Sequence, residues 1–166
     1  MIETITYQGK EYPKFQTTGN AASYITPFAR QVCQGTGFDI GCGKLEWGLS
    51  GAIPIDPAIY PAYNSNNLPF DLYEPLDYIF SSHCLEHVDN WFETLKYWHS
   101  GLKTGGTMFL YLPDYSQEYW RPWNNPRHKH IFTPAVIQDA FHALGLKKVF
   151  VSGVDLYNSF AAMGEK

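Results

Sequence analysis

Two glycines close to residue 40 form a short turn with an acidic residue beside it. Gly41-Cys42-Gly43 follows Asp39 by one residue, after a short apolar segment. Small residues allow the backbone to approach a ligand closely, and the N–H groups of the turn after a strand can bind a carboxylate or phosphate. The third glycine of a dinucleotide fingerprint is missing. A tight turn without a ligand is the structural alternative.

A second acidic residue strengthens the case for a ligand. Asp56 ends the next apolar segment, 15 residues after Gly41. An acid at that place in a parallel sheet can accept both hydroxyls of a ribose. The alternative is a turn residue preceding Pro57. Taken together, the glycine turn and Asp56 predict a nucleoside cofactor that is held without a pyrophosphate-binding loop.

Histidines form a second group with chemical potential. His83, Glu86 and His87 have the i, i+3 and i+4 spacing of one helical face, and His128 and His130 alternate farther along. His-x-x-Glu-His also has the form of an inverted zinc-protease motif, but a protease would not explain the glycine turn or Asp56. We assign His83 and His87 as candidate acid–base residues and assign no metal ligand. Metal binding by this group and purely structural roles stay open.

The elements that must position these residues follow from apolar periodicity. A hairpin is expected at 2–15 around Gly9, and a helix at 20–34 that Asn20 opens, Gly35 closes and Pro27 bends or splits. Further strands are expected at 37–40, 53–55, 76–80, 107–112, 147–152 and 159–163, with helices at 84–102 and 134–144 and a long loop at 113–132. This alternation predicts an α/β fold, a Rossmann-like, mainly parallel sheet with helices on both faces and an antiparallel closing strand.

Length and composition limit the possible classes of protein. The 166 residues suit a single domain, with the hairpin and first helix at 1–34 and the core at 35–166. The net charge of −4 argues against a nucleic-acid or membrane-surface partner. The three cysteines form no CxxC pair, no apolar run approaches the length of a membrane span, and no signal core is visible at 1–15. We therefore expect a cytoplasmic protein.

Several motifs together resemble those of class I S-adenosylmethionine-dependent methyltransferases. They occur in the order and spacing of that family: DIGCG (39–43), IDP (55–57), LPF (68–70), LDYIFSSHCLEHV (76–88), LKTGGTMFLYLPD (102–114) and HIFTP (130–134). The chain looks most like the small type-11 methyltransferase domains, which include relatives of the quinone-biosynthesis enzymes. The resemblance covers residues 35–163 and implies S-adenosylmethionine as cofactor.

The resemblance also implies roles for individual residues. The methionine part of the cofactor would be lined by Asp39, Gly41, Cys42 and Gly43. Asp56 would hold the ribose hydroxyls. Asn64 and Ser65 stand where the family usually keeps an acidic residue and its neighbour against the adenine, and an amide replaces an acid only in part. Ser81, Ser82 and His83 would flank the methyl-transfer centre.

The chain departs from the family pattern in one region. Eleven residues separate Asp56 from Leu68, where the family usually has a helix and a strand. The third strand and its helix are therefore expected to be reduced, and substrate binding would fall to the hairpin 2–15 and the loop 113–132. We predict a methyltransferase acting on a small molecule, sugar or lipid-linked precursor, and a homodimer through the hairpin is conceivable. The alternatives are a non-catalytic cofactor-binding module and a nicotinamide-dependent reductase.

Overall fold

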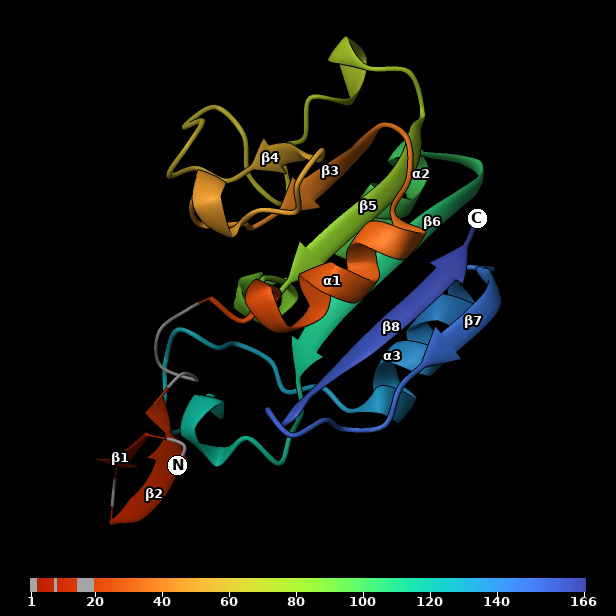
Figure 1. The fold of residues 1–166 in the computed structure, drawn as a ribbon. Helices are drawn as coiled ribbons and strands as arrows, with labels where there is room; N and C mark the ends of the chain where they lie inside the picture. Colours follow the sequence, from red (N-terminus) through yellow and green to blue (C-terminus); the bar gives the residue numbers. More distant parts are fainter. Residues whose placement is uncertain (1–2, 8, 15–19) are drawn as a thin grey trace.

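The centre of the computed structural model, which describes residues 3–7, 9–14 and 20–166, is a six-stranded sheet (Figure 1). The strand order is β4-β3-β5-β6-β8-β7. The first four of these strands are parallel, and β8 runs antiparallel to both of its neighbours. The bounds are β3 Gly37–Ile40, β4 Ile53–Ile55, β5 Leu76–Ser82, β6 Leu102–Pro113, β7 Lys147–Val151 and β8 Ser159–Glu165. The predicted Rossmann-like fold with an antiparallel closing strand is confirmed.

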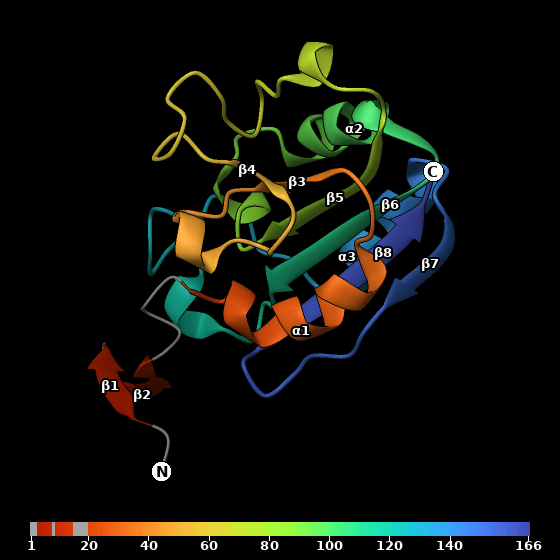
Figure 2. The ribbon, with the colours of Figure 1, turned by 45° about the horizontal axis from the view of Figure 1, so that its top comes forward.

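Helices cover both faces of this sheet (Figure 2). Helix α1 (Ala22–Val32) packs on one face through Ala29, which lies with Tyr78 and Phe80 in one buried cluster. Helices α2 (Trp91–Gly101) and α3 (Pro134–Ala143) cover the other face, and the apolar cluster there includes Ile79. Because side chains alternate along a strand, β5 supplies both clusters. The sheet is therefore buried on both sides.

The N-terminal hairpin lies beside the loop that follows β6 (Figure 1). Strands β1 (Thr4–Tyr7) and β2 (Lys10–Pro13) pair antiparallel, as predicted, although residues 2, 8 and 15 of the expected hairpin lie outside the described residues. The Tyr7 hydroxyl donates to the carbonyl of Asn124 at 2.6 Å. Lys10 forms an ion pair with Glu118. The structure thus brings together the two segments that were expected to bind substrate.

The prediction for the first helix was wrong in two respects. Helix α1 begins at Ala22 with Ala21 as its N-cap, and Asn20 makes no side-chain capping bond. Pro27 lies inside the helix and does not split it. Proline removes one backbone N–H donor from a helix, a local loss that the packing of Ala29 and the rest of the buried face outweighs.

The helix expected at 84–102 was also wrong in its bounds. Residues 85–87 form a separate 3-10 turn, η4 (Leu85–His87), and α2 begins only at Trp91. Between them Val88 is extended, and Asn90, a residue type that favours turns, ends the break. Helix α2 ends at Gly101, where a Cβ atom would lie 2.1 Å from the Phe70 ring.

Most of the remaining elements agree with the sequence, but β6 begins at Leu102, earlier than the strand expected at 107–112. The Thr133 hydroxyl caps α3, and β7 and β8 form the closing pair. Between β4 and β5, a fully described stretch, the structure has only the 3-10 turn η3 (Phe70–Leu72) and an isolated bridge between Asn64 and Asn67, so the third strand is indeed missing. Among the described residues, no helix has the length and apolar character needed to span a bilayer.

Candidate functional site

The glycine turn connects the carboxyl end of β3 to the neighbouring strand. Gly41 and Gly43 both have positive φ angles, +82° and +71°, which favour glycine. The Gly41 N–H donates to the carbonyl of Ile55 at 2.8 Å. A Cβ atom on Gly41 would lie 2.4 Å from the Sγ atom of Cys84. Gly41 is therefore required both by its conformation and by the close approach of the segment before η4.

Asp56 holds the same turn from the end of β4. Its Oδ2 atom accepts the Gly43 N–H at 2.9 Å and its Oδ1 atom accepts the Ala58 N–H at 2.8 Å. Each carboxylate oxygen has a further lone pair, so a half-buried carboxylate fixed in this way can still accept from a ligand. The two features predicted to form one site are thus in direct contact.

A groove of about 400 Å³ opens beside this contact. Its walls include Gly41, Asp56, Asn64, Ser65 and His87. The structure therefore brings the residues predicted for ribose and adenine to one cavity.

Two of these wall residues already use one polar group locally. The side-chain oxygen of Asn64 accepts the N–H of Asn66 at 2.8 Å, and the carbonyl of Ser65 accepts the indole N–H of Trp98 at 2.7 Å. The amide nitrogen of Asn64 and the hydroxyl of Ser65 are the polar groups that these two bonds leave unused.

Asp39 and Cys42 are buried, whereas Gly41, Gly43 and Asp56 are partly exposed. Asp39 is 2% exposed and its Oδ2 atom accepts the Leu49 N–H at 2.6 Å. Burial raises the pKa of Asp39 to about 7, and the nearby Asp56 carboxylate acts in the same direction. Burial likewise raises the pKa of the Cys42 thiol to about 12, which leaves it an unreactive filler. Neither side chain is among the groove walls.

The two serines at the end of β5 differ in their bonding. The Ser81 hydroxyl donates to the carbonyl of Ile40 at 2.8 Å and so joins β5 to β3. The buried Ser82 hydroxyl has no protein partner. Among the described residues, Ser82 therefore offers an unused polar group at the carboxyl end of β5, while Ser81 bonds to the neighbouring strand.

Glu86 is the centre of the histidine group. Its carboxyl group is fully buried, and within the described part of the chain neither oxygen has a hydrogen-bond partner. The Oε1 atom lies 3.6 Å from Nδ1 of His83 and 3.9 Å from Nε2 of both His87 and His128. His83, Glu86 and His87 do converge as predicted, but Glu86 and His87 lie on the 3-10 turn η4 and His83 lies just before it, so the three do not share one face of an α-helix.

Hydrogen bonds orient these imidazole rings. Nδ1 of His87 lies 2.7 Å from the carbonyl of Arg127, and a carbonyl can only accept, so Nδ1 carries the proton and Nε2 keeps its lone pair. Nε2 of His83 bonds to the Ser159 hydroxyl at 3.1 Å. His130 instead points its Nε2 atom at the carbonyls of Val88 and Asp89 and does not join Glu86.

Burial keeps this group uncharged. It lowers the pKa of His83 and of His128 to about 3, with neighbouring imidazoles adding to the effect. Burial also lowers the pKa of His87, and it raises the pKa of Glu86 to about 8. At neutral pH the site therefore presents neutral imidazoles around a carboxyl group that lacks a hydrogen-bond partner.

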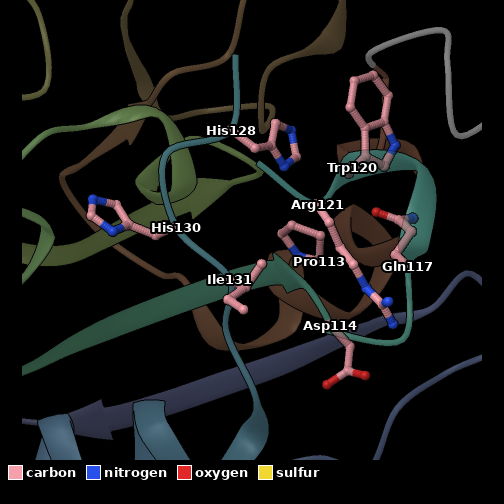
Figure 3. Close-up of a pocket in the computed structure, with 8 residues that line it drawn as sticks. All are labelled: Pro113, Asp114, Gln117, Trp120, Arg121, His128, His130 and Ile131. Atoms are coloured by element: carbon pink, nitrogen blue, oxygen red, sulfur yellow. The ribbon is translucent and has the colours of Figure 1, made fainter. Parts of the chain in front are cut away.

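The loop 113–132 closes over a second, very small pocket (Figure 3). This pocket, of about 10 Å³, lies between the segment that carries Trp120 and Arg121 and the segment that carries His128 and Ile131. The Trp120 and His128 rings stack at 4.9 Å, and the buried side-chain oxygen of Gln117 has no partner. Sequence reasoning missed Gln117, because a single glutamine in an irregular loop carries no pattern.

Comparisons with known proteins agree with this geometry. Residues 17–151 match a family described as "Methyltransferase domain". No curated protein matches the chain. A SAM-dependent methyltransferase from Archaeoglobus fulgidus has a similar structure, with a TM-score of 0.63, 18% identity, and coverage of 88% of this chain and 95% of that one.

Two further solved structures share the fold. A chain in the complex between the Haloferax volcanii Trm112 methyltransferase activator and a methyltransferase has a TM-score of 0.65 at 15% identity, with 92% and 95% of the two chains covered. The 1,6-didemethyltoxoflavin-N1-methyltransferase of Burkholderia thailandensis, with bound S-adenosylhomocysteine, has a TM-score of 0.64 at 13% identity, with 92% and 81% covered. At such identities the likeness shows the fold.

Proposed function

Because the chain belongs to this methyltransferase-domain family, we propose that it transfers a methyl group from S-adenosylmethionine to a small-molecule acceptor. The family match confirms the resemblance drawn from the sequence motifs. The observation that carries the proposal is the glycine turn bonded to Asp56 at the wall of the 400 Å³ groove. Pockets for small molecules and cofactors generally measure about 300–1,000 Å³.

The groove fits the chemical groups of S-adenosylmethionine, which is the cofactor. Asp56 is fixed by two backbone N–H groups and has lone pairs left for ribose hydroxyls. The Asn64 amide nitrogen and the Ser65 hydroxyl are the polar groups proposed to face the adenine. Asp39, Gly41, Cys42 and Gly43 shape the methionine end largely from beneath, while Ser81 and Ser82 close the end of β5. When bound, the cofactor supplies an electrophilic methyl group on a sulfonium.

The acceptor side is formed by the hairpin and the loop 113–132. Aromatic rings meet there: Tyr7 and Tyr119 lie 4.9 Å apart, and Trp120 stacks on His128. Aromatic surfaces suit a ring, a sugar or a lipid-linked precursor. The net charge of −4 does not suit a nucleic acid. The structural relative with 1,6-didemethyltoxoflavin bound also takes a small molecule.

His83 and His87 are the proposed proton acceptors for an acceptor hydroxyl or amine. His87 is better placed, since it borders the groove and its Nε2 lone pair is held available by the bond from Nδ1 to Arg127. His83 is more enclosed, between Ser159 and Glu86.

Calorimetric titration with S-adenosylhomocysteine tests the cofactor site. We expect micromolar binding by the wild type and a loss of roughly tenfold or more in Asp56→Ala, because hydrogen bonds to a charged acceptor are removed. Asp139→Ala, at an exposed position of α3, is the matched control and should bind like the wild type. Failure of the folded wild type to bind either form of the cofactor would contradict the proposal.

A non-catalytic cofactor-binding module is the second candidate, and the missing strand between β4 and β5 favours it. Such a module would bind the cofactor without turnover. The two are separated by incubating the protein with S-adenosylmethionine and a panel of phenols, sugars and polyprenyl precursors. Release of S-adenosylhomocysteine that depends on one acceptor supports the enzyme, and cofactor binding with no release from any acceptor supports the module.

A further inference from the structure

The buried carboxyl group of Glu86 has no hydrogen-bond partner among the described residues, although imidazoles surround it. An unpaired buried carboxyl group is energetically unfavourable unless something compensates it. The three histidines nearest to it offer nitrogen atoms 3.6–3.9 Å from Oε1, too far for hydrogen bonds. The Glu86 carboxyl group and the three imidazoles therefore face one another without forming hydrogen bonds to one another.

Three of these groups have the arrangement of metal ligands. One ligand atom each from Glu86, His87 and His128 lies within 4.8 Å of the other two. Ligands about 2.1 Å from a tetrahedral zinc ion lie roughly 3.4 Å from one another. The 3.9 Å separations from Glu86 to the two histidines would have to contract by about half an ångström. The separation between His87 and His128, at most 4.8 Å, would have to contract by at most about 1.4 Å, and side-chain rotation can supply both changes.

The surrounding bonds hold these ligands in the required form. Nδ1 of His87 donates its proton to the carbonyl of Arg127. The lone pair of Nε2, which faces Glu86, is therefore available to bind a metal ion. Metal-binding histidines usually have such an outer partner. The backbone carbonyl of Glu86 accepts the N–H groups of Lys129 and His130 at 2.7 and 3.2 Å, and this fixes the segment that delivers His128.

We propose that Glu86, His87 and His128 bind a divalent transition ion such as Zn²⁺ between the cofactor groove and the pocket under the loop. His87 lines the groove and His128 lines the loop pocket (Figure 3). Two imidazoles and one carboxylate suit zinc and similar ions better than Mg²⁺ or Ca²⁺. Three protein ligands leave a position for water, as in zinc sites that are not purely structural.

His83 is not one of the proposed ligands. Its Nδ1 atom lies 3.6 Å from the same Glu86 oxygen, while its Nε2 atom bonds to Ser159. A metal at the site would engage Nε2 of His87, so that His87 would act as a ligand and not as a proton acceptor. The inference rests on the proposed function only in its location, since the ion would adjoin the groove assigned to S-adenosylmethionine.

Equilibrium dialysis of the metal-stripped protein against Zn²⁺ tests the site, with a Co²⁺ absorption spectrum as the geometric readout. We expect one Zn²⁺ per chain and an intense four-coordinate Co²⁺ spectrum. His87→Gln and His128→Gln should each weaken binding by at least the roughly 10–100-fold that loss of an outer partner costs. His142→Gln, at an exposed position of α3, is the matched histidine control and should bind like the wild type.

Three results would overturn the metal site: no stoichiometric Zn²⁺, equal binding by wild type and both ligand variants, or a loss that follows His142→Gln. Circular dichroism on each variant shows whether it is folded, and two independent ligand variants guard against failure of one. Titration of the same samples with S-adenosylhomocysteine separates the two proposals. Cofactor binding without Zn²⁺ refutes the site alone, and Zn²⁺ binding without the cofactor refutes the proposed function alone.

Discussion

At the scale of single residues, the buried Asp39 makes the stability of the folded state depend on pH. Burial holds its pKa at about 7 against an ordinary value of 3.8, although it accepts one backbone bond from Leu49. A raised pKa in the folded state means that the stability associated with this group is complete below pH 3.8 and is lost as the pH rises to about 7. The acid must be ionised in the folded core above that pH, where it lacks a cationic partner.

Asp39→Asn should remove this dependence. Raising the pKa from 3.8 to about 7 corresponds to roughly 4 kcal/mol. The free energy of unfolding of the wild type, measured by urea titration relative to the variant, should therefore fall by up to that amount between about pH 4 and pH 7.5. The same comparison with the exposed Asp139→Asn should be flat. A flat difference for Asp39→Asn as well would show that burial does not raise this pKa.

Gly41 carries two separate constraints that a pair of variants can resolve. Gly41 and Gly145 have similar φ angles, +82° and +77°, but of the two only Gly41 has a close neighbour, the Cys84 sulfur, 2.4 Å from where a Cβ atom would lie. Gly145→Ala should cost roughly 1–2 kcal/mol for the conformation alone. Gly41→Ala should cost a further 1–3 kcal/mol or so for overpacking. Equal losses in urea unfolding would mean that the Cys84 segment moves away without penalty.

Residue types predicted the contact between the glycine turn and Asp56 better than the arrangement of the histidines. A glycine turn and an acid at strand ends must meet, because the ends of adjacent parallel strands lie together. No such rule selects His128 over His130, since both alternate in an irregular loop. His128 is brought next to Glu86 because the backbone N–H groups of the two residues after it donate to the Glu86 carbonyl. These are tertiary contacts, which the local sequence pattern does not reveal.

At the scale of elements, strands were predicted more accurately than helix ends. The bounds of β3 and β4 follow directly from short apolar runs between turn residues. Residues 84–102 have continuous helical periodicity, yet Asp89 and Asn90 interrupt the helix through local turn preferences. Pro27 shows the opposite error, because tertiary packing keeps a helix intact across a residue that disfavours it.

The contact between hairpin and loop predicts protection of the loop from proteolysis. The double variant Tyr7→Phe, Lys10→Ala loses the bond to Asn124 and the ion pair with Glu118. A hydrogen bond contributes about 1 kcal/mol and an exposed ion pair less, so opening of the loop should increase by roughly fivefold. Tryptic cleavage after Arg127, followed by mass spectrometry, measures this.

Thr4→Ala is the matched control for that experiment. The Thr4 hydroxyl donates to the Glu11 carboxylate within the hairpin, and this bond does not involve the loop. Cleavage of this variant should proceed at the wild-type rate. If the double variant is also cleaved at that rate, the hairpin does not restrain the loop.

At the scale of the whole molecule, the elements of the candidate site gather at the carboxyl ends of the parallel strands. The carboxyl ends of the parallel strands β3, β4, β5 and β6 point to the same end of the sheet, and the hairpin lies at that end, beside the loop that follows β6 (Figure 1). With the third strand missing, β4 forms the edge of the sheet, and Pro54 within it suits an edge because proline has no N–H to donate. The sheet is thus reduced on the side proposed to hold the adenine, while the hairpin and the loop 113–132 extend the side proposed to hold the acceptor.

Ligand binding in the groove should stabilise the whole chain as one cooperative unit. If residues 1–166 form a single cooperative domain, S-adenosylhomocysteine at about 100 times its Kd adds roughly 2.7 kcal/mol, which raises the Tm by roughly 5–10 °C for a chain of this length. Scanning calorimetry should show one transition that shifts intact, and Asp56→Ala should reduce the shift strongly. Two transitions, of which only one responds to the ligand, would mean that the hairpin and first helix unfold separately from the core. In that case the loop 113–132 would lose its contacts with the hairpin before the cofactor site unfolds.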